Sequence, residues 1–180
     1  AVTGVERVAP VEIVDGDRCG RFTSTVISGI DVKPSAEWMA RRLTAAGMRP
    51  ISNVVDVSNY VMLELNQPNH AYDLDALGGG GFRIRLAADG EPLTTLDGVA
   101  RKLGVRTGVV AGPAVPLALA GVMGGASSEV SDETRAVALE AAYWEPLAIR
   151  RAAKALGMHT EASHRFERGA DPEGAPLATA

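Results

Sequence analysis

The chain has 180 residues, which suits one domain or two small ones, and its 46% hydrophobic and 22% charged residues exclude a disordered chain. Its net charge of −4 and its content of 2 Trp, 3 Tyr and 3 Phe exclude a strongly basic nucleic-acid binder and a base-stacking platform. The single cysteine, Cys19, excludes an internal disulfide and a cysteine-based zinc site.

The same features predict a compartment. One cysteine fits a reducing cytoplasm, and no apolar run approaches the roughly 18 residues that a membrane helix needs. The first residues lack the cationic and apolar regions of a signal peptide. We therefore expect a cytoplasmic protein that makes no membrane contact. Because the sequence begins without Met and ends at residues 177–180 without a stop signal, we expect a piece of a longer protein.

The first part of the chain predicts one strand and two helices. β-Forming residues without helical period predict a strand over residues 21–30. An early Pro and a late Gly delimit a helix over residues 33–47. A second helix is predicted from Ser52 to just before Gln67. Its apolar residues share one face: Val54, Val57, Val61 and Leu65.

The rest of the chain predicts mostly strands. Four glycines at 78–81 predict a flexible, exposed connector. Short apolar or alternating segments then predict strands, at 82–86, 91–96, 108–112, 117–122 and 135–141. Helical spacing returns at 143–156 and at 162–168. We therefore predict an α+β fold, with a strand-rich middle that forms a mixed or barrel-like sheet flanked by helices.

One candidate binding group lies on the second predicted helix and after it. Asp56, Ser58 and Asn59 interrupt an otherwise apolar helix, and His70 lies in a loop that Pro68 restrains. These polar side chains either line a site or form a solvated helix face with a histidine that caps a neighbouring group.

A second candidate group is the glycine-rich segment AGVMGG, residues 120–125, at the end of a buried strand. Glycines let backbone N–H groups approach a ligand closely, as in anion-binding nests. The segment has neither the Walker spacing nor the G-x-G-x-x-G spacing. The alternative is a tight turn that needs a positive φ.

The third candidate is Glu140, which lies within an apolar strand. Strand alternation puts Ala138, Glu140 and Ala142 on one face, and Leu139 and Ala141 on the other. Burying a carboxylate is costly unless it is paired or hydrogen-bonded. Glu140 therefore points either into a polar pocket or to solvent from an exposed strand face.

A metal site is not predicted. His159 and His164 are five residues apart, whereas two ligands on one helix face are four apart, and no acidic or cysteine residue stands in register with them. The surrounding charges predict a solvated helix with a Glu161–Arg165 pair.

Four motifs, taken together and in order, resemble the β chain of bacterial phenylalanyl-tRNA synthetase. They are NVVDVSNYVM (53–62), QPNHAYD (67–73), AGVMGG (120–125) and TEASHRFERG (160–169). The resemblance is to the B3/B4 region, the editing domain, which would span residues 21–172. Residues 1–20 and 173–180 would then be linker segments.

The resemblance implies a function. The family ligates phenylalanine to its tRNA with ATP and Mg²⁺, as a heterotetramer of two α and two β chains whose synthetic site is on the α chain. The B3/B4 region hydrolyses tyrosine mistakenly attached to tRNA(Phe), so this chain by itself would need neither cofactor nor metal and would bind the tRNA acceptor end. The matching pocket positions are Ser58 (where Thr is common), Asn59, His70, Gly124, Gly125, Glu140, Thr160 and Ala162.

The implied chemistry is consistent. A phenylalanine pocket discriminates weakly against an added hydroxyl, so a second, hydrolytic sieve is useful. Glu140 would accept a hydrogen bond from the phenolic hydroxyl, with backbone N–H groups near Gly124 helping. His70, the catalytic candidate, would hold the terminal adenosine or orient water, and no Ser/His/Asp triad is visible.

Two other functions stay open. The chain could be a non-catalytic structural or tRNA-docking module of the β chain, although Glu140 and His70 are both present. It could also be a nucleic-acid-binding module without a pocket, which the net charge of −4 disfavours.

Overall fold

The computed structural model describes residues 9–180, and the expected linker residues 1–8 lie outside this range. It has an α+β fold, as predicted. The strands are β1 (Val11–Ile13), β2 (Cys19–Ser28), β3 (Asn69–Asp73), β4 (Phe82–Leu86), β5 (Glu91–Thr94), β6 (Ala100–Leu103), β7 (Gly108–Ala111), β8 (Pro116–Leu119), β9 (Met123–Gly124) and β10 (Ala136–Trp144). The α-helices are α1 (Glu37–Ala45), α2 (Asn53–Leu65), α3 (Pro146–Leu156), α4 (Glu161–Phe166) and α5 (Gly174–Ala178).

The strands form three sheets. The largest has the order β1-β4-β7-β8-β9 and is mixed, because β1 pairs with β4 in parallel while the other pairs are antiparallel. This sheet is open, with β1 and β9 at its edges, so the mixed form of the expected sheet is confirmed and the barrel-like form is not. The second sheet, β2-β10-β3, is antiparallel, and β5 and β6 form a third.

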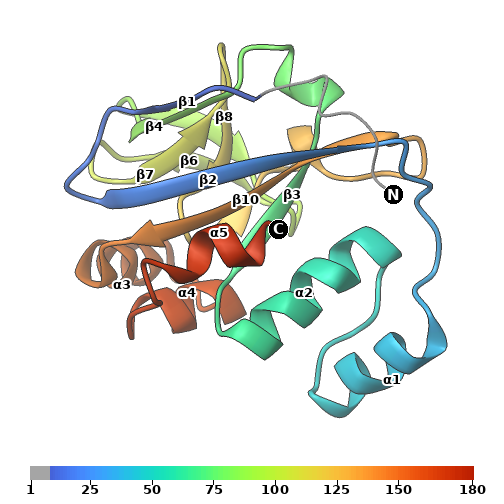
Figure 1. Cartoon of the computed structure of the whole chain (residues 1–180). Helices are drawn as coiled ribbons and strands as arrows, with labels where there is room; N and C mark the ends of the chain where they lie inside the picture. Colours follow the sequence, from blue (N-terminus) through green and yellow to red (C-terminus); the bar gives the residue numbers. More distant parts are fainter. Residues whose placement is uncertain (1–8) are drawn as a thin grey trace.

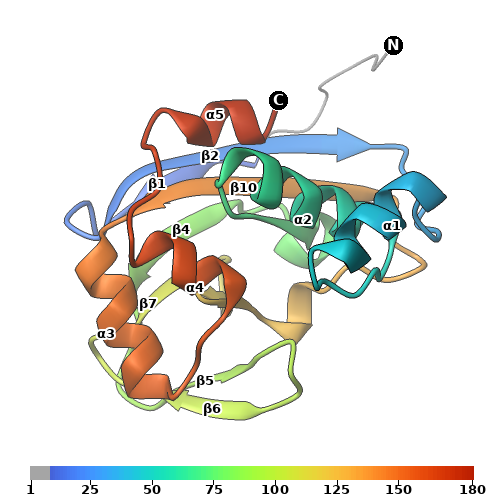
Figure 2. The same ribbon diagram turned by 90° about the horizontal axis from the view of Figure 1, so that it is seen from below.

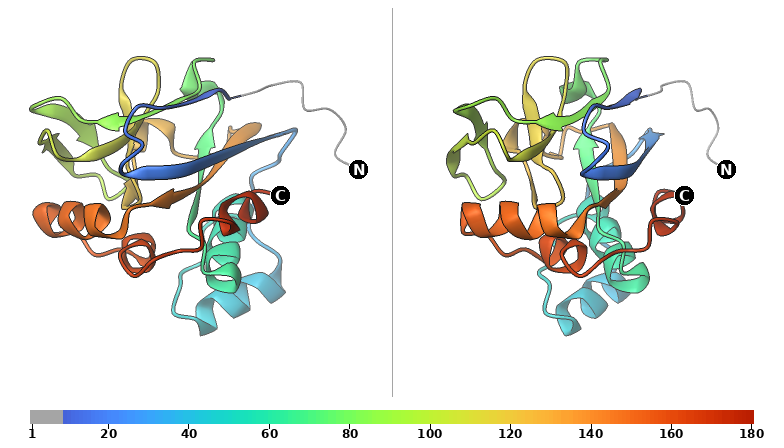
Figure 3. Two further views of the ribbon diagram at one scale, coloured as in Figure 1. Left: turned by 60° about the vertical axis from the view of Figure 1, so that its left-hand side comes forward. Right: turned by 90° about the vertical axis from the view of Figure 1, so that its left-hand side faces the viewer.

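The main core lies between the two larger sheets. In Figure 1 the long β2–β10 pair crosses the molecule, with the strands of the five-stranded sheet on one side and the helices on the other. The side views show the same division (Figure 3). The view from below places α2 and α4 in front of the strands, with α5 at the upper edge beside β2 and with β5 and β6 at the lower edge (Figure 2). The large buried side chains of the core include Phe22, Tyr72, Phe82 and Trp144.

The alternation predicted for residues 138–142 is confirmed. Ala138 and Ala142 belong to the main core, whereas Ala141 packs with Ala175 and Ala178 of α5 in a second, smaller cluster. Both faces of β10 are therefore covered, one by the five-stranded sheet and one by a helix. Glu140, in phase with Ala138, points into the main core and not to solvent.

The face expected for α2 is only partly buried, because Val61 packs against the cluster of Ala141, Ala175 and Ala178 but two other members do not pack against a core. Val57 and Leu65 are 45% and 42% exposed, and the buried residues of the helix are Asp56 and Met62. Asp56 can be buried because its carboxylate accepts hydrogen bonds from the Ser35 hydroxyl at 2.5 Å and from the Ile51 N–H at 2.8 Å. Asp56 therefore lies on no solvated face; its carboxylate ties Ser35, before α1, and Ile51 to α2.

Both expected linkers contribute to the fold. β1 adds an edge strand to the large sheet, and α5 buries Ala175 and Ala178 beside β10. These segments are short and weakly patterned, so their structure comes from partners far along the chain. The glycine connector is exposed over 78–80, but Gly81 is buried against the backbone carbonyl of Pro10.

Several boundaries also differ from the predictions. The first helix begins at Glu37, and residues 143–144 belong to β10 rather than to α3. Three further strands, β3, β6 and β9, were not predicted as strands at these positions. Among residues 9–180, no helix combines the length and the apolar character that crossing a bilayer requires.

Candidate functional site

His70 lies on a strand and not in the predicted loop. β3 pairs with the central strand β10, and β10 pairs with β2 on its other side. In this register Glu140 is directly opposite His70 on one neighbour and Ser24 on the other. Directly opposed residues share a sheet face, so Ser24, Glu140 and His70 form one row across the face that meets the main core.

Glu140 is 7% exposed, and the buried Tyr72 hydroxyl donates a hydrogen bond to its Oε2. Burial raises the pKa of Glu140 from 4.5 to about 7, while the hydrogen bond from Tyr72 acts in the opposite direction. Near neutral pH this carboxyl group is therefore present in both its charged and its neutral form. Burial, together with the Glu140 charge, holds the pKa of Tyr72 well above 10, so the phenol stays protonated and remains a donor.

His70 packs edge-on against Tyr72, with ring centroids 4.6 Å apart and planes at 87°. Burial lowers the pKa of His70 from 6.5 to about 4, so its imidazole is neutral at pH 7. Its Nε2 is out of contact with solvent and has no hydrogen-bond partner within residues 9–180. A neutral ring with one unpaired nitrogen is suited to bind a polar group that enters the core.

The place of Gly124 in β9 explains why the segment 120–125 has a glycine at this position. A Cβ at this position would lie 2.5 Å from Nε2 and Cε1 of His70, so only glycine lets β9 come this close to the His70 ring. The neighbouring Gly125 N–H donates to the Leu117 carbonyl at 2.7 Å and is therefore not available to a ligand. Positive φ occurs at Gly121, so the tight-turn interpretation holds there.

Thr160 and Ala162 reach this region from α4. The Thr160 hydroxyl donates to the Val122 carbonyl at 2.8 Å, and its oxygen accepts from the Ser163 N–H at 3.0 Å as the N-cap of the helix. Ala162 is half-buried and packs against the main core. The start of α4 is thus fixed to the turn that precedes β9.

Ser58 and Asn59 lie on α2, beside the start of β3. The Ser58 hydroxyl donates to the Asn69 carbonyl, and the Asn69 side chain donates to the Ser58 carbonyl, both at 3.1 Å. This reciprocal pair fixes α2 to the residue that precedes His70. Asn59 is half-buried on the next position of the helix.

The structure therefore gathers most of the candidate residues around β3, β9 and β10. Two pockets, of about 20 and 360 Å³, have other linings. The smaller one is next to Trp144 and Ile149, and the larger one is next to Pro10 and Pro113. Neither pocket is lined by Glu140 or His70.

Tyr72 is the functional candidate that the sequence alone did not reveal. It follows His70 by two residues, so it shares the face of His70 once the segment is known to be a strand. Because the segment had been interpreted as a loop, this spacing carried no information.

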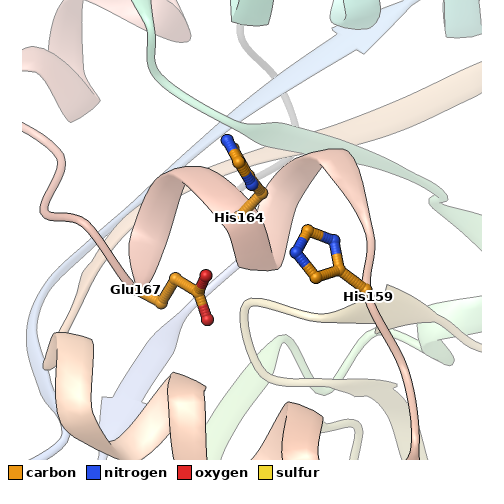
Figure 4. A group of neighbouring side chains, drawn as sticks. All are labelled: His159, His164 and Glu167. Atoms are coloured by element: carbon orange, nitrogen blue, oxygen red, sulfur yellow. The ribbon is translucent and has the colours of Figure 1, made fainter.

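A second polar cluster lies at α4, where His159, His164 and Glu167 each place a ligand atom within 4.8 Å of the others' (Figure 4). The spacing argument had found no acidic residue in register with the two histidines. The structure brings Glu167 beside both, because His159 lies before the helix and its side chain returns to the helix surface (Figure 4).

Comparisons with known proteins agree with the motifs. A family model of the B3/4 domain matches residues 18–180. The phenylalanine–tRNA ligase β subunit of Geobacter metallireducens is 50% identical over 171 residues, which cover 95% of this chain and 21% of that protein. The corresponding subunit of Yersinia pestis is 47% identical over 172 residues, which cover 95% of this chain and 22% of that protein.

Among solved structures, an N-terminal fragment of the phenylalanyl-tRNA synthetase β-subunit from Pyrococcus horikoshii superimposes with a TM-score of 0.54. It is 12% identical and covers 87% of this chain and 50% of that one, so it shows the common fold alone. The chain spans about a fifth of the length of the curated relatives it matches (21% for Geobacter metallireducens). It therefore belongs to the B3/4 domain family of the phenylalanyl-tRNA synthetase β subunit.

Proposed function

We propose that this domain edits mischarged tRNA(Phe) by hydrolysing the ester between tyrosine and the tRNA. The observation that carries the proposal is the hydrogen bond from Tyr72 to the buried Glu140. It is the contact that a tyrosyl substrate would make, and it shows that a phenolic hydroxyl fits this carboxylate inside an apolar core. Tyr72 takes Oε2, which leaves Oε1 for the phenol of a substrate.

Selectivity against phenylalanine follows from this contact. A bound phenylalanine would cover Glu140 without donating a hydrogen bond, and an unpaired buried polar group costs ~1–3 kcal/mol. The ionised carboxylate accepts a hydrogen bond most strongly. The Tyr72 bond lowers the pKa of Glu140 and therefore also supports recognition of a phenolic hydroxyl near neutral pH.

Hydrolysis itself needs little machinery. An ester requires only an oriented water molecule, and the tRNA's own ribose hydroxyl can assist. The neutral imidazole of His70, with Nε2 unpaired, would hold the terminal adenosine or that water. We propose that His70 positions the reacting groups, and we do not assign to it the removal of a proton from the attacking water molecule.

The proposed partners come from the relatives' names and from what the family resemblance implies. We propose that the domain acts within a phenylalanine–tRNA ligase β chain, paired with α chains in a heterotetramer of two α and two β chains, and receives the acceptor end of tRNA(Phe). ATP and Mg²⁺ would serve the α chain's synthetic site. Location in the cytoplasm and independence of the editing domain from cofactors stay predictions.

A non-catalytic structural or tRNA-docking module is the second candidate. It is favoured because Glu140 accepts from Tyr72, Ser58 donates to Asn69 and Thr160 donates to Val122. Such internal pairs are what a purely structural core contains. The two candidates differ in whether the domain reacts with Tyr-tRNA(Phe).

The test is single-turnover deacylation of Tyr-tRNA(Phe) and Phe-tRNA(Phe), by this chain and by the α and β chains together. Ala162→Trp should abolish hydrolysis of Tyr-tRNA(Phe), because the indole fills space that the tyrosyl ring needs. Ala152→Trp, on the half-buried side of the neighbouring α3, is the matched control and should retain hydrolysis. Circular dichroism confirms that both variants fold.

Two further variants separate the proposed roles. Glu140→Ala should reduce the selectivity for tyrosine over phenylalanine. His70→Ala should slow hydrolysis by a factor of roughly tens or more and leave tyrosine binding nearly unchanged. If folded Ala162→Trp clears Tyr-tRNA(Phe) at the normal rate, the pocket lies elsewhere. If wild type hydrolyses neither substrate in either preparation, the structural or docking module is the better interpretation.

A further inference from the structure

We propose that His159, His164 and Glu167 bind a divalent transition-metal ion of the zinc class at the surface of α4. His159 lies just before the N-cap Thr160, His164 lies in the helix, and Glu167 is its C-cap residue. Their three ligand atoms lie within 4.8 Å of one another, and the imidazole centroids are 5.3 Å apart. In Figure 4 His164 rises from the helix between His159 at one end and Glu167 at the other.

Two imidazoles and one carboxylate are a recognised donor set for zinc. In such sites the metal lies ~2.0–2.2 Å from each ligand atom, and a water molecule completes a tetrahedron. In such a tetrahedron the ligand atoms lie ~3.3–3.6 Å apart, so side-chain rotations must bring these atoms closer than the present limit of 4.8 Å. His159 is exposed and the other two are half-buried, which leaves their rings and carboxylate room to rotate.

Arg168 now occupies the position of the cation. Its Nη1 lies 2.9 Å from Nδ1 of His164 and donates to Glu167 Oε1 at 3.0 Å. The guanidinium therefore holds two of the three donors together, and a metal ion must displace it. Because the Arg168 side chain is 59% exposed, it can move into solvent without disturbing the core.

A nearby carboxylate is already paired. Glu161 accepts a hydrogen bond from Arg165 at 2.7 Å. Glu161 and Arg165 both lie outside the ligand set, so a change at this pair can serve as a control.

Among residues 9–180, no other group of three His, Cys, Asp or Glu side chains is placed to hold a metal ion. The remaining histidine, His70, has its Nε2 enclosed in the core. The only cysteine, Cys19, is buried, and burial raises the pKa of its thiol to about 12, so the thiolate that a metal needs does not form near neutral pH. Binding that is lost in the ligand variants can therefore be assigned to the α4 cluster.

The experiment titrates tag-free chain with Co²⁺, whose visible absorption reports imidazole coordination, followed by displacement with Zn²⁺. We expect one ion per chain. Removing a ligand in His159→Ala or in Glu167→Gln should weaken binding at least tenfold, because loss even of supporting groups costs ~10–100-fold. Arg168→Ala should strengthen binding, since it removes the competing guanidinium.

Arg165→Ala is the matched control, because it deletes a second arginine of α4 that bonds Glu161 instead of the ligand set. It should leave Co²⁺ affinity within about twofold of the wild type. His159 is exposed, so loss of binding in His159→Ala cannot be attributed to unfolding. Binding that persists in a His159→Ala/His164→Ala variant, or absence of a Co²⁺ spectrum in both wild type and Arg168→Ala, overturns the proposal.

Discussion

Burial acts in opposite senses on two residues that face each other across β3 and β10. It raises the pKa of Glu140 from 4.5 to about 7 and lowers the pKa of His70 from 6.5 to about 4. Glu140 therefore stabilises the fold fully below pH 4.5, and this contribution is lost as the pH rises through about 7. The contribution of His70 is present above pH 6.5 and is lost as the pH falls through about 4.

The first prediction isolates the Glu140 contribution. Glu140→Gln keeps the shape but cannot titrate, so the wild type should lose stability relative to this variant between pH 4.5 and 7.5. At ~1.4 kcal/mol per pKa unit, the relative loss is up to ~3 kcal/mol. Urea unfolding at three pH values measures it. Glu133→Gln, at an exposed position, is the control, and a Glu140→Gln difference that is independent of pH would contradict the expectation.

At the scale of elements, the approach of β9 to β3 depends on the absence of a side chain at Gly124. Gly124→Ala should destabilise the domain by ~1–3 kcal/mol, because the new methyl group overlaps the His70 ring. His70→Ala should recover most of this loss in the double variant by removing the obstacle. Thermal or urea unfolding of the four proteins gives the coupling energy, and strictly additive effects would show that the two residues are not in contact.

The helix α5 gives a second prediction at this scale. Ala175 is fully buried beside Ala141, whereas Leu177, two residues on, is 64% exposed. Ala175→Glu should destabilise by ~3 kcal/mol or more, because it buries an unpaired charge. Leu177→Glu is the matched control and should change stability by ~0.5 kcal/mol or less. Equal effects would mean that α5 is not docked as described.

At the scale of the whole molecule, the charge balance limits affinity for nucleic acid. The net charge of −4 cannot drive the release of counterions that supports tight tRNA binding. The isolated chain should therefore bind tRNA(Phe) with a dissociation constant above about 1 μM at near-physiological salt. Fluorescence anisotropy measures this, with the assembled α and β chains as the positive control. Submicromolar binding by the isolated chain would reveal a basic surface that the net charge conceals.

Much of the secondary structure could be predicted from local patterns. Strong periodicity, caps or Pro and Gly signals mark three elements: the helix at 53–65, the strand at 82–86 and the helix at 146–156. All three appear close to their predicted bounds. Segments that lack such signals were missed: β3 has polar ends, and β1 and α5 are short. These three are stabilised by pairing or packing with β4 and β10, which local sequence does not encode.

Local patterns are enough to predict the α+β class, the family and the phase of the strand that turns Glu140 toward the same face as Ala138 and Ala142. Contacts between distant segments bury Asp56, place His70 on a strand against Gly124, and let Tyr72 donate to Glu140. The tertiary structure also brings Glu167 beside His159 and His164. The physical reason is that burial and hydrogen-bond partners depend on segments far apart in the chain, and these same contacts set the pKa values on which the proposed chemistry depends.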